Sequence, residues 1–319
     1  MKVVVFLEWK EKCFRVSAED LSFLKSLLPR KAEVKRVKSE RAFLKELKTA
    51  THVITWHFRK EWYQLAPKLK LLATPAAGRE LVEPPPPSTI QPFNHSTFQP
   101  FNLHFGHYHG AFMAESVTAF CLAWARGFFK ERPDAWSRAW LSDKVMDLAG
   151  SRAVILGYGN VGKAIGAKLE ALGVEVHGYS RHRPLKPCEL KKLDPDWLIL
   201  ALPSTTGTDD MIDAAFLNKL PRKCVLVNVG RGNSVDEKAL IAALKAGRLA
   251  GAYLDVIKNE PSGTVPLFSG STIDVAADDP AEALGLKGKL VLMPHSSAFS
   301  PMYLKECFKE LENDGCFRS

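Results

Sequence analysis

Three residues suited to acid–base and anion-binding chemistry follow apolar runs in the second half of the sequence. Arg231 lies in VNVGRGNSVDEKAL, Glu260 in LDVIKNEP and His295 in MPHSSAF. Taken singly, they could be a helix-cap partner, a surface acid and a turn histidine. Together they supply a permanent cation for an anionic group, an imidazole that exchanges a proton near neutral pH, and a carboxylate that favours the protonated imidazole. The three residues therefore predict an acid–base site, provided that the fold brings them together.

The second half of the sequence also predicts a sheet that would bring them to one edge. It contains six strongly apolar runs, and strands of such composition are covered on both faces, as in a parallel, doubly wound α/β domain. In these domains ligands lie beyond the carboxyl ends of the strands. We expect this domain to span residues 105–298. The six apolar runs that predict its strands are SRAVILGYG, VEVHGYS, DWLILALP, KCVLVNVG, LAGAYLDV and KLVLMPH.

The first of these runs leads into a G-x-G-x-x-G motif formed by Gly157, Gly159 and Gly162, and a predicted helix leaves it. The first glycine permits a tight turn, the second lets the backbone approach a pyrophosphate, and the third packs helix against strand. The positive end of the helix would meet the phosphates. The motif, with Asn160 and Val161, predicts a Rossmann dinucleotide site; the alternative is a glycine-rich turn without a ligand.

The tip of the second strand, in VEVHGYSRHR, carries cations where such sites usually carry an acid. That acid would lie about 20 residues past the glycines and accept hydrogen bonds from ribose hydroxyls. Ser180 removes its repulsion toward a 2′-phosphate, and Arg181 and Arg183 offer planar charged groups that suit phosphate oxygens. The stretch predicts NADP(H) in preference to NAD(H), which remains possible. The alternative is that these arginines are solvated surface charges.

The N-terminal part alternates apolar and amphipathic runs, from KVVVFLEW to LKLLATP, and this pattern predicts a second, smaller α/β domain. The C-terminal stretch SPMYLKECFKELENDG predicts a helix that packs back on it. We therefore predict an α/β protein with two doubly wound domains. A Rossmann cofactor domain, 105–298, is inserted in a flavodoxin-like substrate domain, 1–104 and 299–319.

A proline-rich stretch before residue 104 contains an octapeptide twice, STIQPFNH at 88–95 and STFQPFNL at 96–103. Proline this dense is excluded from helices and sheet interiors. We interpret residues 84–103 as a duplicated surface loop, partly extended, without chemistry of its own. Beyond it, HGAFMAESVTAFCLAWARGFFKE predicts a long apolar helix that is buried in the core or in a subunit interface.

The composition of the 319 residues limits the function classes. The net charge of +9 admits nucleic-acid binding, but acids interleave with the Lys and Arg residues, as on a solvated helix face, so we predict no nucleic-acid partner. Six cysteines without C-x-x-C spacing predict free thiols in a reducing compartment. No signal peptide and no membrane span of about 20 apolar residues is expected. The sequence thus predicts a cytoplasmic protein without a metal site.

With these motifs the sequence resembles the D-2-hydroxyacid dehydrogenase family, the NAD(P)-dependent 2-oxoacid reductases. The resemblance covers most of 110–300 in GYGNVG, LPSTTGT, LVNVGRGNSVDEKALIAALKAGRLAGAYLDV, NEP and PHSSAF, and is weaker in APKLKLLATPAAG and HGAFMAE. The chain departs from the pattern of the family in four places. The acid that would bind the ribose is replaced, the proline-rich duplication is present, the 261–289 loop is long and the C-terminal tail is short.

The resemblance implies a role for each matching residue. Arg231 would bind and polarise the substrate, His295 would be the acid/base, and Glu260 would support it. The backbone at Ala77 and Gly78 would hold the substrate carboxylate, and Asp255 would contact the nicotinamide carboxamide. The remaining cofactor-binding positions implied are Pro203, Thr208, Val229 and Gly230, and a homodimer is implied.

The leading hypothesis is an NADPH-dependent reductase of a small 2-oxoacid such as glyoxylate or hydroxypyruvate. A second hypothesis is an NAD-linked dehydrogenase of a larger or phosphorylated hydroxyacid. A third is a dinucleotide-sensing protein, like the corepressors of the family, because a binding protein can retain these residues without turnover.

Overall fold

The computed structural model describes residues 1–85, 101–130, 139–142, 144–258, 260 and 280–318. By contacts between Cα atoms the chain forms two compact units, which are Met1–His109 with Phe299–Ser319, and Gly110–Ala298. The first boundary lies after residue 109, whereas the sequence placed it after residue 104. In the described residues, no helix combines the length and apolarity that crossing a membrane requires.

The first unit is built on a five-stranded parallel sheet with the order β2-β1-β3-β4-β5. The chain starts near the middle, adds β2 on one side and then continues on the other, which is the flavodoxin-like doubly wound order. The fully buried strands β3 and β4 occupy the centre. The bounds are β1 Lys2–Phe6, β2 Glu33–Arg36, β3 His52–Thr55, β4 Leu71–Thr74 and β5 Asn102–Phe105.

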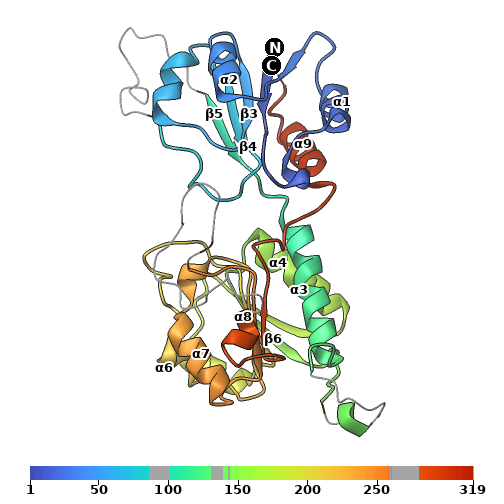
Figure 1. The fold of residues 1–319 in the computed structure, drawn as a ribbon, viewed down its shortest axis with the longest axis vertical. Helices are drawn as coiled ribbons and strands as arrows, with labels where there is room; N and C mark the ends of the chain where they lie inside the picture. The colour runs from blue at the N-terminus through green and yellow to red at the C-terminus, as the bar shows by residue number, and fades with distance from the viewer. Residues whose placement is uncertain (86–100, 131–138, 143, 259, 261–279, 319) are drawn as a thin grey trace. The chain divides into compact units, whose positions relative to one another are not determined.

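Three α-helices cover this sheet, with α1 (Ala18–Leu27) and α9 (Tyr303–Asn313) on one face and α2 (Glu40–Leu47) on the other (Figure 1). Ser17 caps α1 through a capping box with Asp20, which satisfies backbone N–H groups at the helix start. A 3-10 segment, Lys60–Leu65, packs with α2. The sequence predicted that the C-terminal helix packs back on the first domain, and α9 lies in this unit.

The second unit contains a six-stranded parallel sheet with the order β11-β10-β9-β8-β6-β7. The chain runs from β6 to β7 at one edge and then crosses to β8 on the other side of β6. The carboxyl ends of β6 and β8 therefore form the switch point where dinucleotides bind in such sheets. The strands are β6 Arg152–Leu156, β7 Glu175–Tyr179, β8 Trp197–Leu200, β9 Val225–Asn228, β10 Gly251–Leu254 and β11 Leu290–Leu292.

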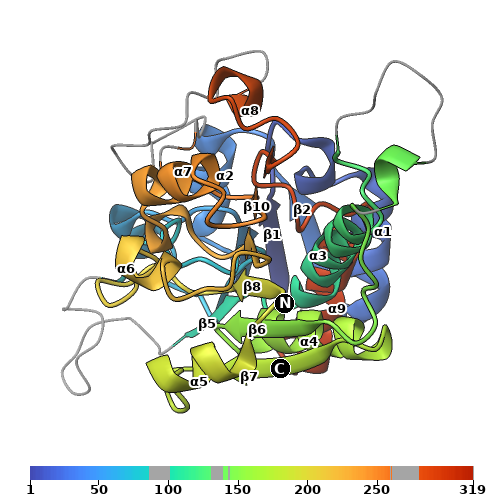
Figure 2. The ribbon, with the colours of Figure 1, turned by 90° about the horizontal axis from the view of Figure 1, so that it is seen from below.

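Helices cover both faces of this second sheet. α3 (Gly110–Ala125) and α4 (Asn160–Ala171) pack together on one face, and α6 (Ala214–Leu217) and α7 (Glu237–Lys245) lie on the other, as Figures 1 and 2 show. The short helices α5 (Pro187–Leu193) and α8 (Pro280–Ala283) complete the unit. Because both faces are covered, the central strands are buried along their whole length, and the predicted fold class of two doubly wound α/β domains is confirmed.

One strand was missed in the sequence. The end of the second octapeptide copy enters β5, whose Asn102 pairs with Leu71 of β4, so the interpretation of 84–103 as a loop is wrong at its end. The strand is only four residues long and lies at the sheet edge, where its alternation was too short to recognise. Most of the duplication (86–100) and of the long loop (261–279) lies outside the described residues.

The glycine motif joins β6 to α4 through close backbone packing. Gly157 has φ of +93°, and a Cβ there would lie 2.4 Å from the carbonyl oxygen of Ala201. A Cβ on Gly162 would lie 2.3 Å from the carbonyl oxygen of Gly157, whereas one on Gly159 would meet no atom within 4 Å. The first and third glycines are therefore required by the fold, and the second faces open space.

This difference predicts costs of different size for two Gly→Ala substitutions. Gly162→Ala should lower the free energy of unfolding by about 1–3 kcal/mol through overpacking, although alanine gains about 1 kcal/mol in helix propensity. Gly159→Ala, the matched control at the helix N-cap, should cost less than about 1 kcal/mol. Urea unfolding followed by circular dichroism measures both, and equal costs would contradict this account of the turn.

Candidate active site

The structure brings His295 and Glu260 into direct contact at the carboxyl edge of the second sheet. Glu260 follows β10, His295 follows the neighbouring β11, and Nδ1 of the imidazole lies 2.7 Å from Oε2 of the carboxylate. About 45% of the His295 side chain is exposed, against 16% for Glu260. The imidazole therefore has its Nδ1 fixed by a largely buried carboxylate while part of the ring faces solvent.

The backbone at His295 is held in an uncommon conformation. Its φ is +52°, in the left-handed region that residues other than glycine adopt seldom. Its N–H donates to the carbonyl oxygen of Asp255 at 2.8 Å, and the Asp255 carboxylate accepts the N–H groups of Ser296 and Ser297 at 2.8–3.1 Å. Ser116 on α3 donates its hydroxyl to the Ser297 carbonyl. These bonds fix the direction in which the imidazole points.

Asp255 is 1% exposed, and both of its carboxylate oxygens accept backbone N–H groups of the 296–297 turn. The contact with a nicotinamide carboxamide that the resemblance implied stays a prediction. The observed bonds give Asp255 a positioning role at the His295 turn that sequence reasoning missed. A polar residue directly after a buried strand was the available signal, but it did not reveal the bonding partner.

Arg231 lies in a tight turn after β9. A Cβ on Gly232 would lie 2.1 Å from the backbone carbon of Ile257, so this position requires glycine for the turn to pack against the end of β10. The amide of Asn228, which is fully buried, donates to the Arg231 carbonyl and accepts the Gly230 N–H, both at 3.1 Å. The Arg231 guanidinium also donates to the Gly230 carbonyl at 2.9 Å.

The pKa of His295 results from opposing effects. Burial lowers the pKa, but the hydrogen bond and charge of Glu260, aided by the charge of Asp255, raise it more, and the positive charge of Arg231 lowers it again. The net result is a pKa above the usual value of an imidazole. Glu260 and Arg231 therefore both act on His295, and the imidazole is biased toward its protonated form.

Glu260 is positioned by a loop with its own anchor. Its Oε1 accepts the N–H of Ile257 at 3.3 Å, and the Lys258 N–H donates to Oε1 of Glu237 at 2.7 Å. Glu237 is 3% exposed and begins α7. Sequence reasoning missed this buried acid, because an acid in the first turn of a helix is common and gives no sign of burial.

The start of α4 suits a phosphate group. Its N-cap is Gly159, and no side chain caps the helix there. The first N–H groups of a helix have no intrahelical partner, and the helix dipole favours an anion at this end. The open space beside Gly159 fits the approach of a pyrophosphate, so the residues present fit a bound dinucleotide; Asn160 and Val161 form the first turn of this helix.

The other predicted cofactor positions lie at neighbouring strand ends of this sheet. Thr208 donates its hydroxyl to the Pro203 carbonyl at 2.8 Å, which closes the loop after β8. Val229 donates its N–H to the Leu200 carbonyl directly after β9, and Gly230 follows it. Ala77 and Gly78 lie after β4 in the first unit, so the structure places the predicted substrate loop in a different unit from the predicted catalytic residues.

The predicted phosphate-binding stretch forms a turn at the tip of β7. Ser180 and Arg183 exchange two backbone hydrogen bonds of 3.0 Å. The Arg183 guanidinium lies over the ring of Tyr179, with its carbon 5.4 Å from the ring centroid, and Arg181 is exposed. The two cations therefore occupy an ordered turn at the carboxyl end of the second strand, where the ribose of a dinucleotide is bound in this fold.

Comparison with known proteins agrees with this geometry. Residues 118–296 match the family described as D-isomer specific 2-hydroxyacid dehydrogenase, NAD binding domain. The chain belongs to this family. It is 29% identical over 262 residues to the glyoxylate reductase of Pyrococcus horikoshii, covering 76% of this chain and 73% of that protein. Over 162 residues it is 35% identical to the glyoxylate reductase of Thermococcus kodakarensis, covering 47% of each chain.

The fold of the whole chain is also found in the family. A crystal structure of a D-isomer specific 2-hydroxyacid dehydrogenase from Lactobacillus delbrueckii ssp. bulgaricus, in an NAD-complexed form, has a TM-score of 0.72 at 18% identity, covering 98% of this chain and 95% of that one. The sequence matches are shorter. The chain spans less than half the length of several curated relatives, 38% for the glycerate dehydrogenase of Methylorubrum extorquens.

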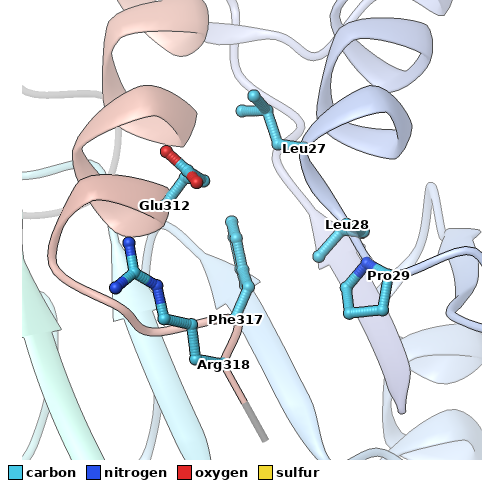
Figure 3. A pocket seen from close by; sticks show the side chains of 6 residues that line it. All are labelled: Leu27, Leu28, Pro29, Glu312, Phe317 and Arg318. Carbon is cyan, nitrogen blue, oxygen red and sulfur yellow. The ribbon is translucent and has the colours of Figure 1, made fainter.

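A pocket of about 460 Å³ lies in the first unit and contains none of the predicted site residues. Figure 3 shows its lining, which comes from the end of α1 on one side and from α9 and the C-terminal segment on the other. Its walls combine apolar side chains with one charge of each sign, namely Leu27, Leu28, Pro29, Glu312, Phe317 and Arg318. This pocket is therefore separate from the predicted catalytic and cofactor-binding residues.

The Glu260–His295 contact predicts a shift that is measurable without substrate. Glu260→Gln removes the charge but retains an oxygen acceptor, so the pKa of His295 should fall, because burial and Arg231 then act with less opposition. An NMR titration of the imidazole measures this pKa. Glu175→Gln, at a His–carboxylate pair on β7, is the matched control and should leave it unchanged. An unchanged His295 pKa in Glu260→Gln would contradict the assignment.

Proposed function

We propose that this chain is an NADPH-dependent reductase of a small 2-oxoacid of the glyoxylate or hydroxypyruvate type. The observation that supports this most is the 2.7 Å contact between His295 and Glu260, under the electrostatic influence of Arg231, on a family dinucleotide-binding domain. The names of relatives as glyoxylate reductases support the substrate class. A bound reduced nicotinamide would supply the hydride that reduces the keto carbon.

His295 is proposed as the proton donor to the keto oxygen. Its Nδ1 is held by Glu260, so Nε2 is the atom left to face a substrate, and the raised pKa keeps a proton available near neutral pH. When the proton leaves, Glu260 remains as the acceptor of the Nδ1 N–H and fixes the tautomer. The product is then the 2-hydroxyacid, and the same imidazole accepts the proton in the reverse reaction.

Arg231 is proposed to bind and polarise the substrate. A guanidinium presents parallel N–H groups that match a carboxylate and a carbonyl oxygen, so it can orient a 2-oxoacid and stabilise negative charge on the keto oxygen. The Asn228 and Gly232 contacts hold its backbone, which limits the freedom of the side chain before substrate binds. The backbone at Ala77 and Gly78 is proposed to bind the substrate carboxylate as well.

The preference for NADPH rests on the 180–183 turn. Ser180 is neutral where an acid would repel a 2′-phosphate, Arg181 is exposed, and Arg183 presents its guanidinium beside Tyr179. Arginine forks form strong hydrogen bonds with phosphate oxygens. The ordered backbone of the turn lowers the entropy lost when these side chains bind an anion.

The enzyme proposal is tested by NADPH oxidation with a panel of 2-oxoacids. Glyoxylate or hydroxypyruvate should support turnover, and His295→Asn should reduce kcat by about 10²–10⁴-fold, the range for loss of a general acid. His177→Asn, which breaks a His–carboxylate pair on β7, is the matched control and should keep full activity. Dinucleotide binding without turnover of any 2-oxoacid would instead favour a dinucleotide-sensing protein.

The cofactor proposal is tested by comparing kcat/KM for NADPH and NADH. The wild-type protein should prefer NADPH, and Arg181→Ala should reduce kcat/KM for NADPH about tenfold, as expected for one charge-assisted hydrogen bond, with little change for NADH. Ser180→Asp should move the ratio further toward NADH. Lys191→Ala removes an exposed cation of α5 and is the control. A wild-type preference for NADH would overturn the cofactor proposal.

A further inference from the structure

One cluster of metal-ligand side chains lies in the first unit, apart from all residues assigned above. The Nε2 atom of His104 on β5 lies 3.3 Å from Oε1 of Glu310 and 3.0 Å from Oδ2 of Asp314, at the end of α9. These three atoms lie within 4.8 Å of one another. We propose that His104, Glu310 and Asp314 bind a divalent transition-metal cation of the Zn²⁺ class, a site that the sequence did not predict.

The hydrogen-bonding capacity of the cluster is unbalanced without a cation. The single N–H that Nε2 can carry faces two carboxylates, so it can satisfy only one of them well. A cation between the three atoms would bind the imidazole and both carboxylates together and remove the repulsion between the carboxylates.

The distances agree with a tetrahedral ion. Ligand atoms bound about 2.1 Å from Zn²⁺ at tetrahedral angles lie about 3.4 Å apart, close to the two separations observed. An imidazole nitrogen favours Zn²⁺, Co²⁺ or Ni²⁺ over Mg²⁺ or Ca²⁺, which prefer oxygen ligands. The mixed nitrogen and oxygen donors therefore select the class of ion.

The surroundings have the features of a built site. Both oxygens of Glu310 accept the backbone N–H of His107, at 2.9 and 3.1 Å, so this carboxylate is oriented before any ion arrives. His104 and Glu310 are 13% and 16% exposed, whereas Asp314 is 52% exposed, which leaves an entry path from solvent. The exposed residue His107 also has its ring 6.1 Å from that of His104 between centroids.

The bound ion would join the edge strand β5 to the last turn of α9 within one unit. The two segments are 206–210 residues apart in sequence, and strand edges are places where pairing ends and stability is low. The proposed role is therefore the stabilisation of the first unit, independent of the proposed reductase activity.

The test is isothermal titration of the full chain with Zn²⁺ after treatment with a chelator. One equivalent of Zn²⁺ should bind, and His104→Gln and Asp314→Asn should each weaken binding by more than about tenfold. His177→Gln is the matched control, because His177 contacts a single carboxylate, Glu175, at 2.8 Å, and it should bind as the parent does. Parent-like binding by His104→Gln, or no binding by the parent, would overturn the proposal.

A second measurement separates this cluster from the thiols. Cys316 lies two residues after Asp314, so its thiol is a competing ligand that the test must exclude. Co²⁺ bound to the proposed site should show visible absorption without a sulfur-to-metal charge-transfer band, and Cys316→Ser should leave binding unchanged. A strong charge-transfer band lost in Cys316→Ser would place the ion on the thiol and contradict the proposal.

Discussion

The hydrogen bond between His295 and Glu260 depends on the positions of two strand ends, and the proposed chemistry depends on this bond. The residues are 35 positions apart, and they meet because β10 and β11 are parallel neighbours whose carboxyl ends lie at the same edge of the sheet. The backbone bonds of Asp255 then hold the imidazole in an uncommon conformation. The parallel sheet thus brings two residues that are distant in sequence into hydrogen-bonding contact.

The same edge imposes close approach on the backbone around it. Gly157 and Gly232 lie where two chain segments leave no room for a Cβ, one at the dinucleotide turn and one beside Arg231. Each close contact fixes a turn that carries a functional group. The buried polar residue Asn228 then satisfies backbone groups of the Arg231 turn, and Glu237 accepts the Lys258 N–H of the loop that faces it, as buried polar groups require.

Much of this could be predicted from the sequence, for physical reasons. The central strands β8, β9 and β10 of the second sheet are buried on both faces, so their apolar runs were unmistakable, and the glycine spacing follows from backbone contact at Gly157 and Gly162. The strand β5 was missed because an edge strand of four residues carries little pattern. The order β2-β1-β3-β4-β5 agrees with the predicted flavodoxin-like domain.

The positioning contacts could not be predicted, because they join residues that no local pattern relates. Asp255 binds the N–H groups of Ser296 and Ser297, and the cluster of His104 with Glu310 and Asp314 joins an edge strand to the C-terminal helix. Such pairs depend on tertiary geometry rather than on propensity or periodicity. Arg231, Glu260 and His295 could be proposed in advance because their residue types suit acid–base chemistry and their order resembles that of a family.

The central claim is that Glu260 keeps His295 protonated so that it can donate a proton to a keto oxygen. The most direct test is the pH dependence of kcat/KM for 2-oxoacid reduction. The rate should fall as pH rises through a pKa above the usual value of an imidazole, because only the protonated ring can donate, and in Glu260→Gln the fall should begin at lower pH. A profile that is flat through this range, or one that Glu260→Gln leaves unmoved, would contradict the account.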